Sequence, residues 1–317
     1  MLSAVVRRAL TVAAGPVVSL SAGAALAQPP RVEPSAADLA IATGRLGDAE
    51  AELYAASRRA PREPAARGAL GLFLASRGRL KVGSVLLEEA RQFGADPIAV
   101  GARLAHVYRW QGDWSKVVTL SGPAADDLRD MARWLAAHPG SVSGPDSSSM
   151  TLTPNELAGL GRITITVGGE VVPADIDPTV EGLVLPSTVG VMAALRTFPI
   201  RGGGTAGVAY TVNIGAYTLT GVPARLSDGS GARVGLDVLS PLVPTFDAAA
   251  RRLTLRTHEP ASPRGEALPF LLSFPGVRVV AREGQAPAPL ESAAGRAAVR
   301  GSKWTFDLRR GALLLER

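Results

Sequence analysis

The sequence predicts a multidomain chain in which an α-helical N-terminal part is followed by a β-rich C-terminal part. Two observations predict it. Residues before Pro139 repeat with a period of 34, and from Gly161 onward short segments alternate apolar and polar residues between glycines. Of the 317 residues, 46% are hydrophobic and 20% are charged, so both parts have enough apolar material for a core. This composition excludes a mainly disordered chain.

The first 27 residues have the features of a secretory signal peptide. Arg7 and Arg8 precede an apolar stretch over residues 9–22, and small residues at 25–27 form a cleavage site before Gln28. The sequence therefore predicts a periplasmic or secreted protein, with a membrane anchor as the alternative if the segment is not cleaved. The absence of cysteine excludes thiol catalysis and disulfides.

A helical domain is predicted over residues 34–137. Gly44, Gly78 and Gly112 lie 34 residues apart, each at the end of one helical stretch and just before the next. Small residues recur in a shared register where two antiparallel helices cross closely: Ala37, Gly71 and Ala105, then Ala49 and Gly83, then Ala56 and Ala90. An amphipathic helix over residues 124–137 follows as a cap for the stack. A generic helical bundle is the alternative.

The period and the small-residue pattern of residues 34–121 resemble those of tetratricopeptide (TPR) repeats. The resemblance implies a TPR-like solenoid of helix pairs that binds a protein or peptide partner in a groove and has no chemistry of its own.

Residues 138–154 are rich in Pro, Gly and Ser and predict a linker. After it, residues 162–167 alternate as a strand, and Gly168 and Gly169 form a hairpin turn into the next strand. Further short strands are predicted over residues 210–214, 217–219, 222–226 and 253–256. We expect a small β barrel over residues 155–256 and a C-terminal β extension over residues 257–317.

One stretch of the β part carries candidate chemistry. A strand ends at Asp177, a turn follows to Gly182, and an apolar strand begins at residue 183; about 50 residues later comes an apolar unit around Gly235 and Asp237. With the closing hairpin at residues 245–255, the segment 160–256 resembles the retropepsin-like aspartic peptidases. The resemblance implies that Asp177 is catalytic, that Gly235 and Asp237 are structural, and that a hairpin containing Gly203 and Gly204 folds over substrate as a flap.

The turn departs from the pattern of that family, Asp-Thr-Gly-Ala-Ser-Gly. Pro178 stands at the Thr position, Thr179 at the Gly position and Glu181 at the Ser position, while Gly182 is retained. Proline removes a backbone amide and threonine restricts the turn, and Glu181 adds a second negative charge beside Asp177. These changes predict that Asp177 is a vestige and that the protein is not catalytic. Its predicted role is then protein or peptide binding.

Two other functions stay open at this point. The chain can be an active aspartic endopeptidase in which a homodimer supplies the second Asp177, or a purely structural scaffold of the cell envelope. A second half within the chain is also indicated, because residues 305–307 and the leucines after them repeat residues 245–247 and theirs at identical spacing. Residues 270–302 contain no aspartate. We therefore expect this segment to complete the sheet internally and to cover an edge that would otherwise recruit a second chain.

No cofactor and no metal are predicted. His106, His138 and His258 are far apart, with no ligand at metal-binding spacing. Residues 202–207 match G-x-G-x-x-G, but a strand follows where a phosphate site needs a helix N-terminus. The net charge of +6 comes without blocks of like charge, which excludes nucleic acid as an expected partner.

Overall fold

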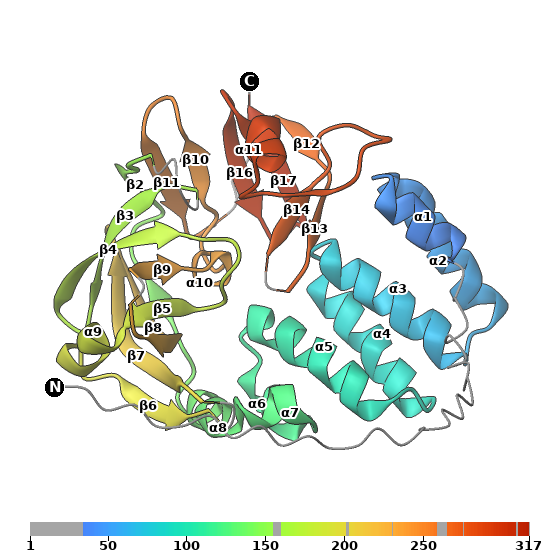
Figure 1. Cartoon of the computed structure of the whole chain (residues 1–317), viewed down its shortest axis with the longest axis horizontal. Helices are drawn as coiled ribbons and strands as arrows, with labels where there is room; N and C mark the ends of the chain where they lie inside the picture. Colours follow the sequence, from blue (N-terminus) through green and yellow to red (C-terminus); the bar gives the residue numbers. More distant parts are fainter. Residues whose placement is uncertain are drawn as a thin grey trace, which may run out of the picture. The chain divides into compact units, whose positions relative to one another are not determined.

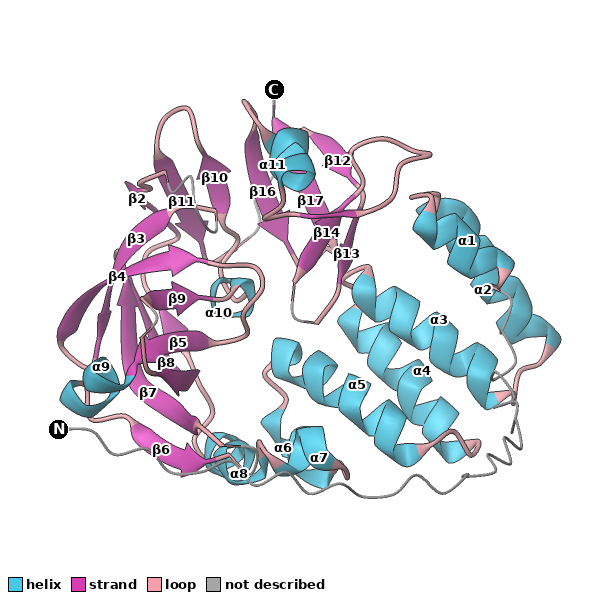
Figure 2. Cartoon of the chain, in the orientation of Figure 1, coloured by secondary structure: helices cyan, strands magenta, loops and turns pink. Residues whose placement is uncertain are grey.

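The computed structural model describes residues 34–154, 160–200, 203–229, 231–258, 265–274, 276–308 and 310–316. The predicted signal peptide lies outside these residues. Within them the helices of residues 36–137 precede a β-rich part, as expected (Figures 1 and 2). None of the helices in this described part combines the length and the apolar character that crossing a membrane requires.

The helices form successive pairs that keep the period of 34 residues. They are α1 (Ala36–Ala42), α2 (Leu46–Arg59), α3 (Pro64–Ser76), α4 (Leu80–Gln92), α5 (Pro97–Gln111), α6 (Trp114–Thr119), α7 (Pro123–Asp126) and α8 (Arg129–Ala137). The turns before α2, α4 and α6 contain Gly44, Gly78 and Gly112, whose φ angles are 69°, 79° and 69°. Glycine is the residue that adopts this conformation at low cost, which explains its recurrence.

The first β layer is a closed barrel. Its strands are β3 (Arg162–Val167), β4 (Glu170–Ile176), β5 (Leu183–Pro186), β7 (Thr205–Ile214), β8 (Tyr217–Ser227) and β9 (Ala232–Val234). They pair in the order β8-β5-β9-β4-β3-β7, and β7 pairs again with β8, which closes the ring. The pairs β4–β9 and β5–β8 are parallel, so the turn after β4 lies next to the end of β9. The outer strands are β1 (Val142–Ser143) and β6 (Arg196–Pro199), and two short helices, α9 (Ser187–Met192) and α10 (Leu236–Leu239), follow β5 and β9.

A second, six-stranded sheet joins the barrel part to the C-terminal segment. Its order is β12 (Glu266–Leu268), β17 (Ala312–Glu316), β16 (Lys303–Asp307), β10 (Thr245–Asp247), β11 (Arg252–Arg256) and β2 (Ser147–Thr151). Strands β10 and β16 meet at its centre, where Thr245 lies opposite Thr305. The hairpins β10–β11 and β16–β17 have the same internal register, offset by 60 residues. The C-terminal segment thus covers the edge of β10, as the sequence predicts.

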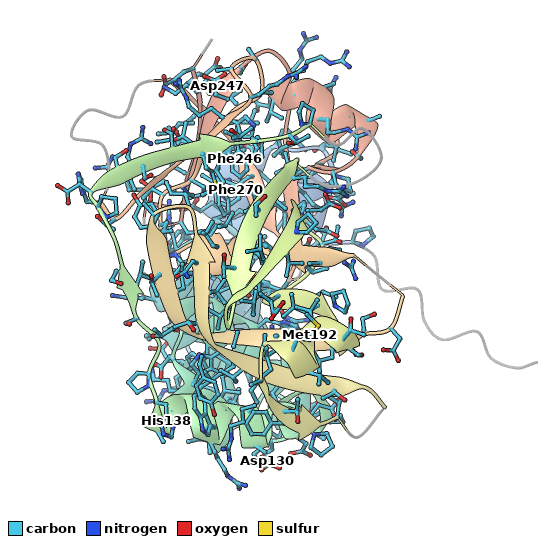
Figure 3. All side chains as sticks on the ribbon, turned by 90° about the vertical axis from the view of Figure 1, so that its left-hand side faces the viewer. Asp130, His138, Met192, Phe246, Asp247 and Phe270 are labelled. Atoms are coloured by element: carbon cyan, nitrogen blue, oxygen red, sulfur yellow. The ribbon has the colours of Figure 1, made fainter. Side chains whose placement is uncertain are left out.

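The C-terminal segment also contains a small third sheet. It consists of β13 (Phe270–Leu272), β14 (Val277–Val279) and β15 (Ala288–Pro289), with α11 (Ala293–Val299) beside it. The Phe246 ring stacks on Trp304 with ring centroids 4.1 Å apart, and Phe270 packs against Phe306 at 5.7 Å. Phe246 and Phe270 are labelled in Figure 3. Aromatic contacts therefore connect the two halves of the six-stranded sheet and the third sheet below it.

The segment predicted as a linker, residues 138–154, is different in the structure. It contains β1, which pairs with β8, and β2, which pairs along all five of its residues with β11. Alternate residues of β2 face outward, Met150 fills the space over Gly215, and Leu152 is buried. An edge strand is held by its backbone hydrogen bonds. A serine-rich segment can therefore form this strand, although its composition is typical of a loop.

The helices and the β part share one hydrophobic core. A continuous cluster of buried side chains runs from Leu104 and Tyr108 in α5 to Leu253 and Phe306 in the six-stranded sheet. A second cluster joins α1, α2 and α3 to Leu271 and Val280. The Arg77 guanidinium, at the end of α3, donates to the Phe270 carbonyl oxygen at 2.6 Å. The described part of the chain is therefore packed as one unit.

Candidate functional site

The candidate catalytic residue, Asp177, directly follows β4. Its backbone N–H donates to the Val234 carbonyl oxygen at 3.0 Å, so the pairing of β4 with β9 fixes its position. One carboxylate oxygen, Oδ1, accepts from the Thr179 amide at 2.8 Å and from the Thr179 hydroxyl at 2.6 Å. The other, Oδ2, lies 3.4 Å from Nη1 of Arg233. Both oxygens of this nearly buried carboxylate are thus engaged by neighbours.

A turn of the C-terminal segment faces the turn that contains Asp177. It connects β13 and β14, and the Ser273 amide donates to the Gly276 carbonyl oxygen at 2.9 Å. A β carbon on Gly276 would lie 3.9 Å from the Pro178 carbonyl oxygen. The facing turn, residues 273–276, has the sequence Ser-Phe-Pro-Gly and contains no acid. The two halves of the β part therefore bring two turns together with a single aspartate between them.

Glu181 is bound by side chains of helix α5. Its carboxylate lies 2.9 Å from the His106 ring nitrogen Nδ1 and 3.3 Å from Nη1 of Arg109, and it accepts from the Trp110 indole N–H at 3.2 Å. Its side chain is only 7% exposed. Burial alone would raise the pKa of Glu181, but the hydrogen bond from His106 and the charge of Arg109 outweigh it and place the pKa below its ordinary range.

This arrangement corrects the expectation that Glu181 acts as a second charge beside Asp177. Its side chain is instead neutralised by residues more than 70 positions earlier in the chain. His106, Arg109 and Trp110 lie at spacings that place them on one face of α5. This spacing is visible in the sequence, but it does not show that the three side chains bind Glu181. The Phe274 ring also lies on this face, 6.3 Å from His106 and 6.2 Å from Trp110.

Gly182, Gly235 and Asp237 hold the turn from below. The Gly182 amide donates to both carboxylate oxygens of Asp237, at 2.9 and 2.8 Å, and the Gly235 amide donates to the Gly182 carbonyl oxygen at 2.9 Å. A β carbon at Gly235 would collide with Asp237 and with the Val180 carbonyl oxygen, so only glycine fits. Burial raises the pKa of Asp237 to about 6, against the opposing charge of Arg109 and the Gly182 amide.

Among the described residues, nothing lies within 4 Å of a β carbon built at Gly203 or Gly204, and their role as a flap stays a prediction. They lie in the turn between β6 and β7, are exposed, and exchange backbone hydrogen bonds with Ile200. Strand β6 lies against α8, where the Arg196 guanidinium is 5.9 Å from the centre of the Trp134 ring. The three histidines are also apart: His106 is at Glu181, His138 stacks on Trp134, and His258 is near Asp146. In the described ranges no group of three potential metal ligands occurs.

Comparison with known proteins gives a similarity among solved structures only. No family model matches the sequence, and no curated protein matches it. Among solved structures, the chain is similar to a retropepsin-like aspartic protease from Rickettsia conorii, with 13% sequence identity and a TM-score of 0.29. The alignment covers 37% of this chain and 93% of that protein.

Proposed function

We propose that this chain is an exported protein with a retropepsin-like but non-hydrolytic β part, which binds protein or peptide partners through its TPR-like helix pairs. One observation carries the non-catalytic half of this proposal. Asp177 is the only aspartate in the sequence of the two facing turns, residues 177–182 and 273–276, and its oxygens are engaged by Thr179 and Arg233.

Aspartic hydrolysis needs two carboxyl groups that share one proton, one as base toward water and one as acid toward the peptide carbonyl. The turn opposite Asp177 supplies Ser273 in a sequence without an acid. Arg233 beside Asp177 is a permanent cation that cannot accept a proton. Within the described residues no second carboxyl group contacts Asp177 to share its proton, and the covered edge of β10 removes one surface through which a second copy would supply it.

The binding half of the proposal rests on the helices. The inner side of α5 is occupied by Glu181 and Phe274 of the same chain. Helices α1 and α4 carry large apolar side chains in solvent: Leu39, Val82 and Val85 are 51%, 50% and 58% exposed. Exposed apolar side chains grouped on one surface are typical of interaction sites. Val82 and Val85 lie one turn apart on α4 and are the residues we assign to the partner surface.

A peptidase assay tests the non-catalytic half. The purified protein is incubated with a mixed peptide library between pH 3 and pH 7, beside its Asp177→Asn variant, and products are read by mass spectrometry. We expect the two proteins to give the same peptide profile as the buffer. Cleavage by the natural protein that Asp177→Asn abolishes would establish the endopeptidase and end the proposal.

A binding assay tests the other half. The full chain, a Val82→Asp/Val85→Asp variant and a Val171→Asp variant are used to retain proteins from the envelope fraction of the native host. Val171 is 70% exposed on β4, so its replacement is a matched control for surface charge. We expect partners that the natural chain and the control retain and the double variant loses. If none of the three retains a specific protein, the structural scaffold becomes the better function. Fractionation of the same cells tests the proposed periplasmic or secreted location.

A further inference from the structure

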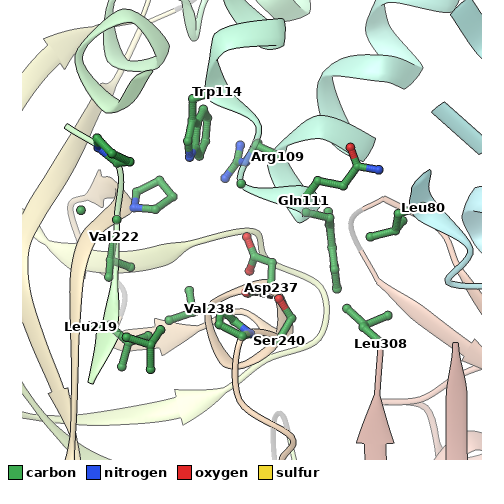
Figure 4. A pocket seen from close by; sticks show the side chains of 18 of the residues that line it. Leu80, Arg109, Gln111, Trp114, Leu219, Val222, Asp237, Val238, Ser240 and Leu308 are labelled. Carbon is green, nitrogen blue, oxygen red and sulfur yellow. Dashed lines mark hydrogen bonds between the residues drawn. The ribbon is translucent and has the colours of Figure 1, made fainter. Parts of the chain in front are cut away.

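A cavity of about 950 Å³ lies between the helices and the barrel (Figure 4). The ends of α5 and the starts of α4 and α6 form one wall, and β8, α10 and residues 139–142 form the other. Asp177 is not among its lining residues. Its size is at the upper end of the range of about 300–1,000 Å³ that small-molecule sites occupy.

The inner wall of the cavity is apolar. The side chains that form it are buried and come from both parts of the chain: Leu80, Trp110, Trp114, Val222, Val238 and Leu308. Two charged groups at its floor have partners: Nη1 of Arg109 pairs with Glu181, and Asp237 accepts from the Gly182 amide. The buried Nε of Arg109 has no hydrogen-bond partner within the described residues. The interior therefore favours an apolar body over a charged one.

The rim of the cavity is cationic. Lys81 and Arg79 line it and are exposed to solvent. The Arg79 guanidinium uses one nitrogen on Glu50 at 2.6 Å, whereas the Lys81 ammonium makes no hydrogen bond or ion pair with a residue in the described ranges. A free ammonium beside an apolar cavity is complementary to an anionic head attached to an apolar chain.

We propose that this cavity binds an amphiphile with a single carboxylate head and an unbranched or peptide-like apolar body. The head lies at Lys81 and Arg79, and the body enters between Trp110 and Trp114 on one side and Val222 and Val238 on the other. This site goes beyond the proposed function, since it does not use Asp177. Val82 borders both the cavity and the proposed partner surface, whereas Val85 is outside the lining. A free fatty acid and the carboxyl end of an apolar peptide share this chemistry.

Calorimetric titration of the full chain with octanoate, decanoate and dodecanoate, each below its micelle concentration, tests the proposal. We expect affinity to rise about two- to fourfold for each added methylene, because each one leaves water for the cavity wall. Dodecyltrimethylammonium, with the opposite head charge, should bind at least tenfold more weakly than dodecanoate. Equal affinity for the two heads, or no detectable binding of dodecanoate at 1 mM, would overturn the proposal.

Variants locate the site. Lys81→Met should weaken dodecanoate binding about five- to tenfold and reduce its dependence on salt, while Lys116→Met, at a lysine outside the lining, should change neither. Val222→Trp, which fills the inner wall without altering charge, should abolish binding; circular dichroism verifies that each variant is folded. Unchanged binding in both Lys81→Met and Val222→Trp would place the ligand elsewhere and refute the assignment.

A comparison of acetyl-trileucine that has a free carboxylate with its amide then decides the source of the ligand. Binding tighter than that of dodecanoate, lost in the amide, identifies the carboxyl end of a peptide. Weaker binding than that of dodecanoate identifies a free fatty acid.

Discussion

Glu181 connects the β barrel to helix α5 through three donors on one helix face. A buried carboxylate is stable only when its hydrogen-bonding capacity is filled, and here an imidazole, a guanidinium and an indole fill it. The same three side chains also close the space beside the Asp177 turn. At the scale of single residues, Glu181 therefore stabilises the turn from outside, and it is absent from the chemistry that Asp177 would need.

Replacement of Glu181 by glutamine should destabilise the protein by about 2–3 kcal/mol, because it leaves the buried Arg109 without its counter-charge. Urea unfolding followed by tryptophan fluorescence measures the change. Glu283→Gln, at an exposed turn, is the matched control and should stay within about 0.5 kcal/mol of the natural protein. Since the pKa of Glu181 is lowered, its contribution is present above about pH 4.3 and is lost as the pH falls through the folded-state pKa. An acid-stable protein with no loss in the glutamine variant would contradict this role.

The raised pKa of Asp237 predicts that its contribution to the free energy of unfolding depends on pH with the opposite sign to that of Glu181. Its pKa is raised to about 6, whereas an unfolded aspartate titrates near about 3.9. Between these values the folded protein binds more protons than the unfolded chain, so the contribution of Asp237 falls as the pH rises from about 4 to about 6 and is level above that. The change is up to about 3 kcal/mol. Asp237→Asn should remove this slope in urea midpoints measured from pH 4.5 to pH 7.5, and the exposed Asp228→Asn should keep it. A slope that survives in Asp237→Asn would assign it to another group.

At the scale of elements, the sequence predicts the helices, which follow a periodic pattern, but it misses a strand that is held only by backbone pairing. The helix starts at Leu46, Leu80 and Trp114 follow from a repeat that each helix pair must obey to pack on the next. Strand β2 carries no such signal, since its serines match a loop and its place is determined by β11. The match between residues 245–247 and 305–307 predicted that the C-terminal segment completes the sheet. That β10 and β16 pair directly at its centre is seen only in the structure.

The centre of the six-stranded sheet offers a test of that pairing. Thr245 and Thr305 share a hydrogen bond of 2.8 Å between their hydroxyls, both buried, and Arg256 donates to Thr245 at 2.7 Å. Thr305→Val should cost about 1 kcal/mol of unfolding free energy. In a double-mutant cycle with Thr245→Val, we expect a coupling energy of about 1 kcal/mol. Thr254→Val, whose partner Ser149 lies in the exposed edge strand, is the control and should cost less. Additive effects of Thr245→Val and Thr305→Val would show that the pairing of β10 with β16 does not depend on this hydrogen bond.

At the scale of the whole molecule, the sequence predicts two domains and a linker, whereas the structure packs them on one core. The contacts that unite them join residues far apart in the chain, such as Arg77 with Phe270 and His106 with Glu181. No local pattern marks such contacts, because each side chain alone is compatible with an exposed helix end or a solvated loop. The location of Asp177 was predictable from its strand and turn. Its partner Thr179 is a local contact two residues further along the turn. Arg233, by contrast, becomes a partner only when β4 and β9 lie side by side.

Two of the repeat glycines, Gly78 and Gly112, allow a direct test of the packing between the helices and the C-terminal sheet. Gly78 and Gly112 occupy equivalent turns with similar φ angles, 79° and 69°, so alanine at either position carries the same backbone strain of about 1 kcal/mol. A β carbon at Gly78 would lie 2.8 Å from the Gly311 Cα in the C-terminal segment, whereas one at Gly112 meets nothing within 4 Å. Gly78→Ala should therefore cost roughly 2 kcal/mol more than Gly112→Ala in urea unfolding, and hydrogen exchange should show faster opening of β17 in Gly78→Ala alone. Equal losses in the two variants would mean that the helix pairs and the C-terminal sheet do not pack against each other in solution.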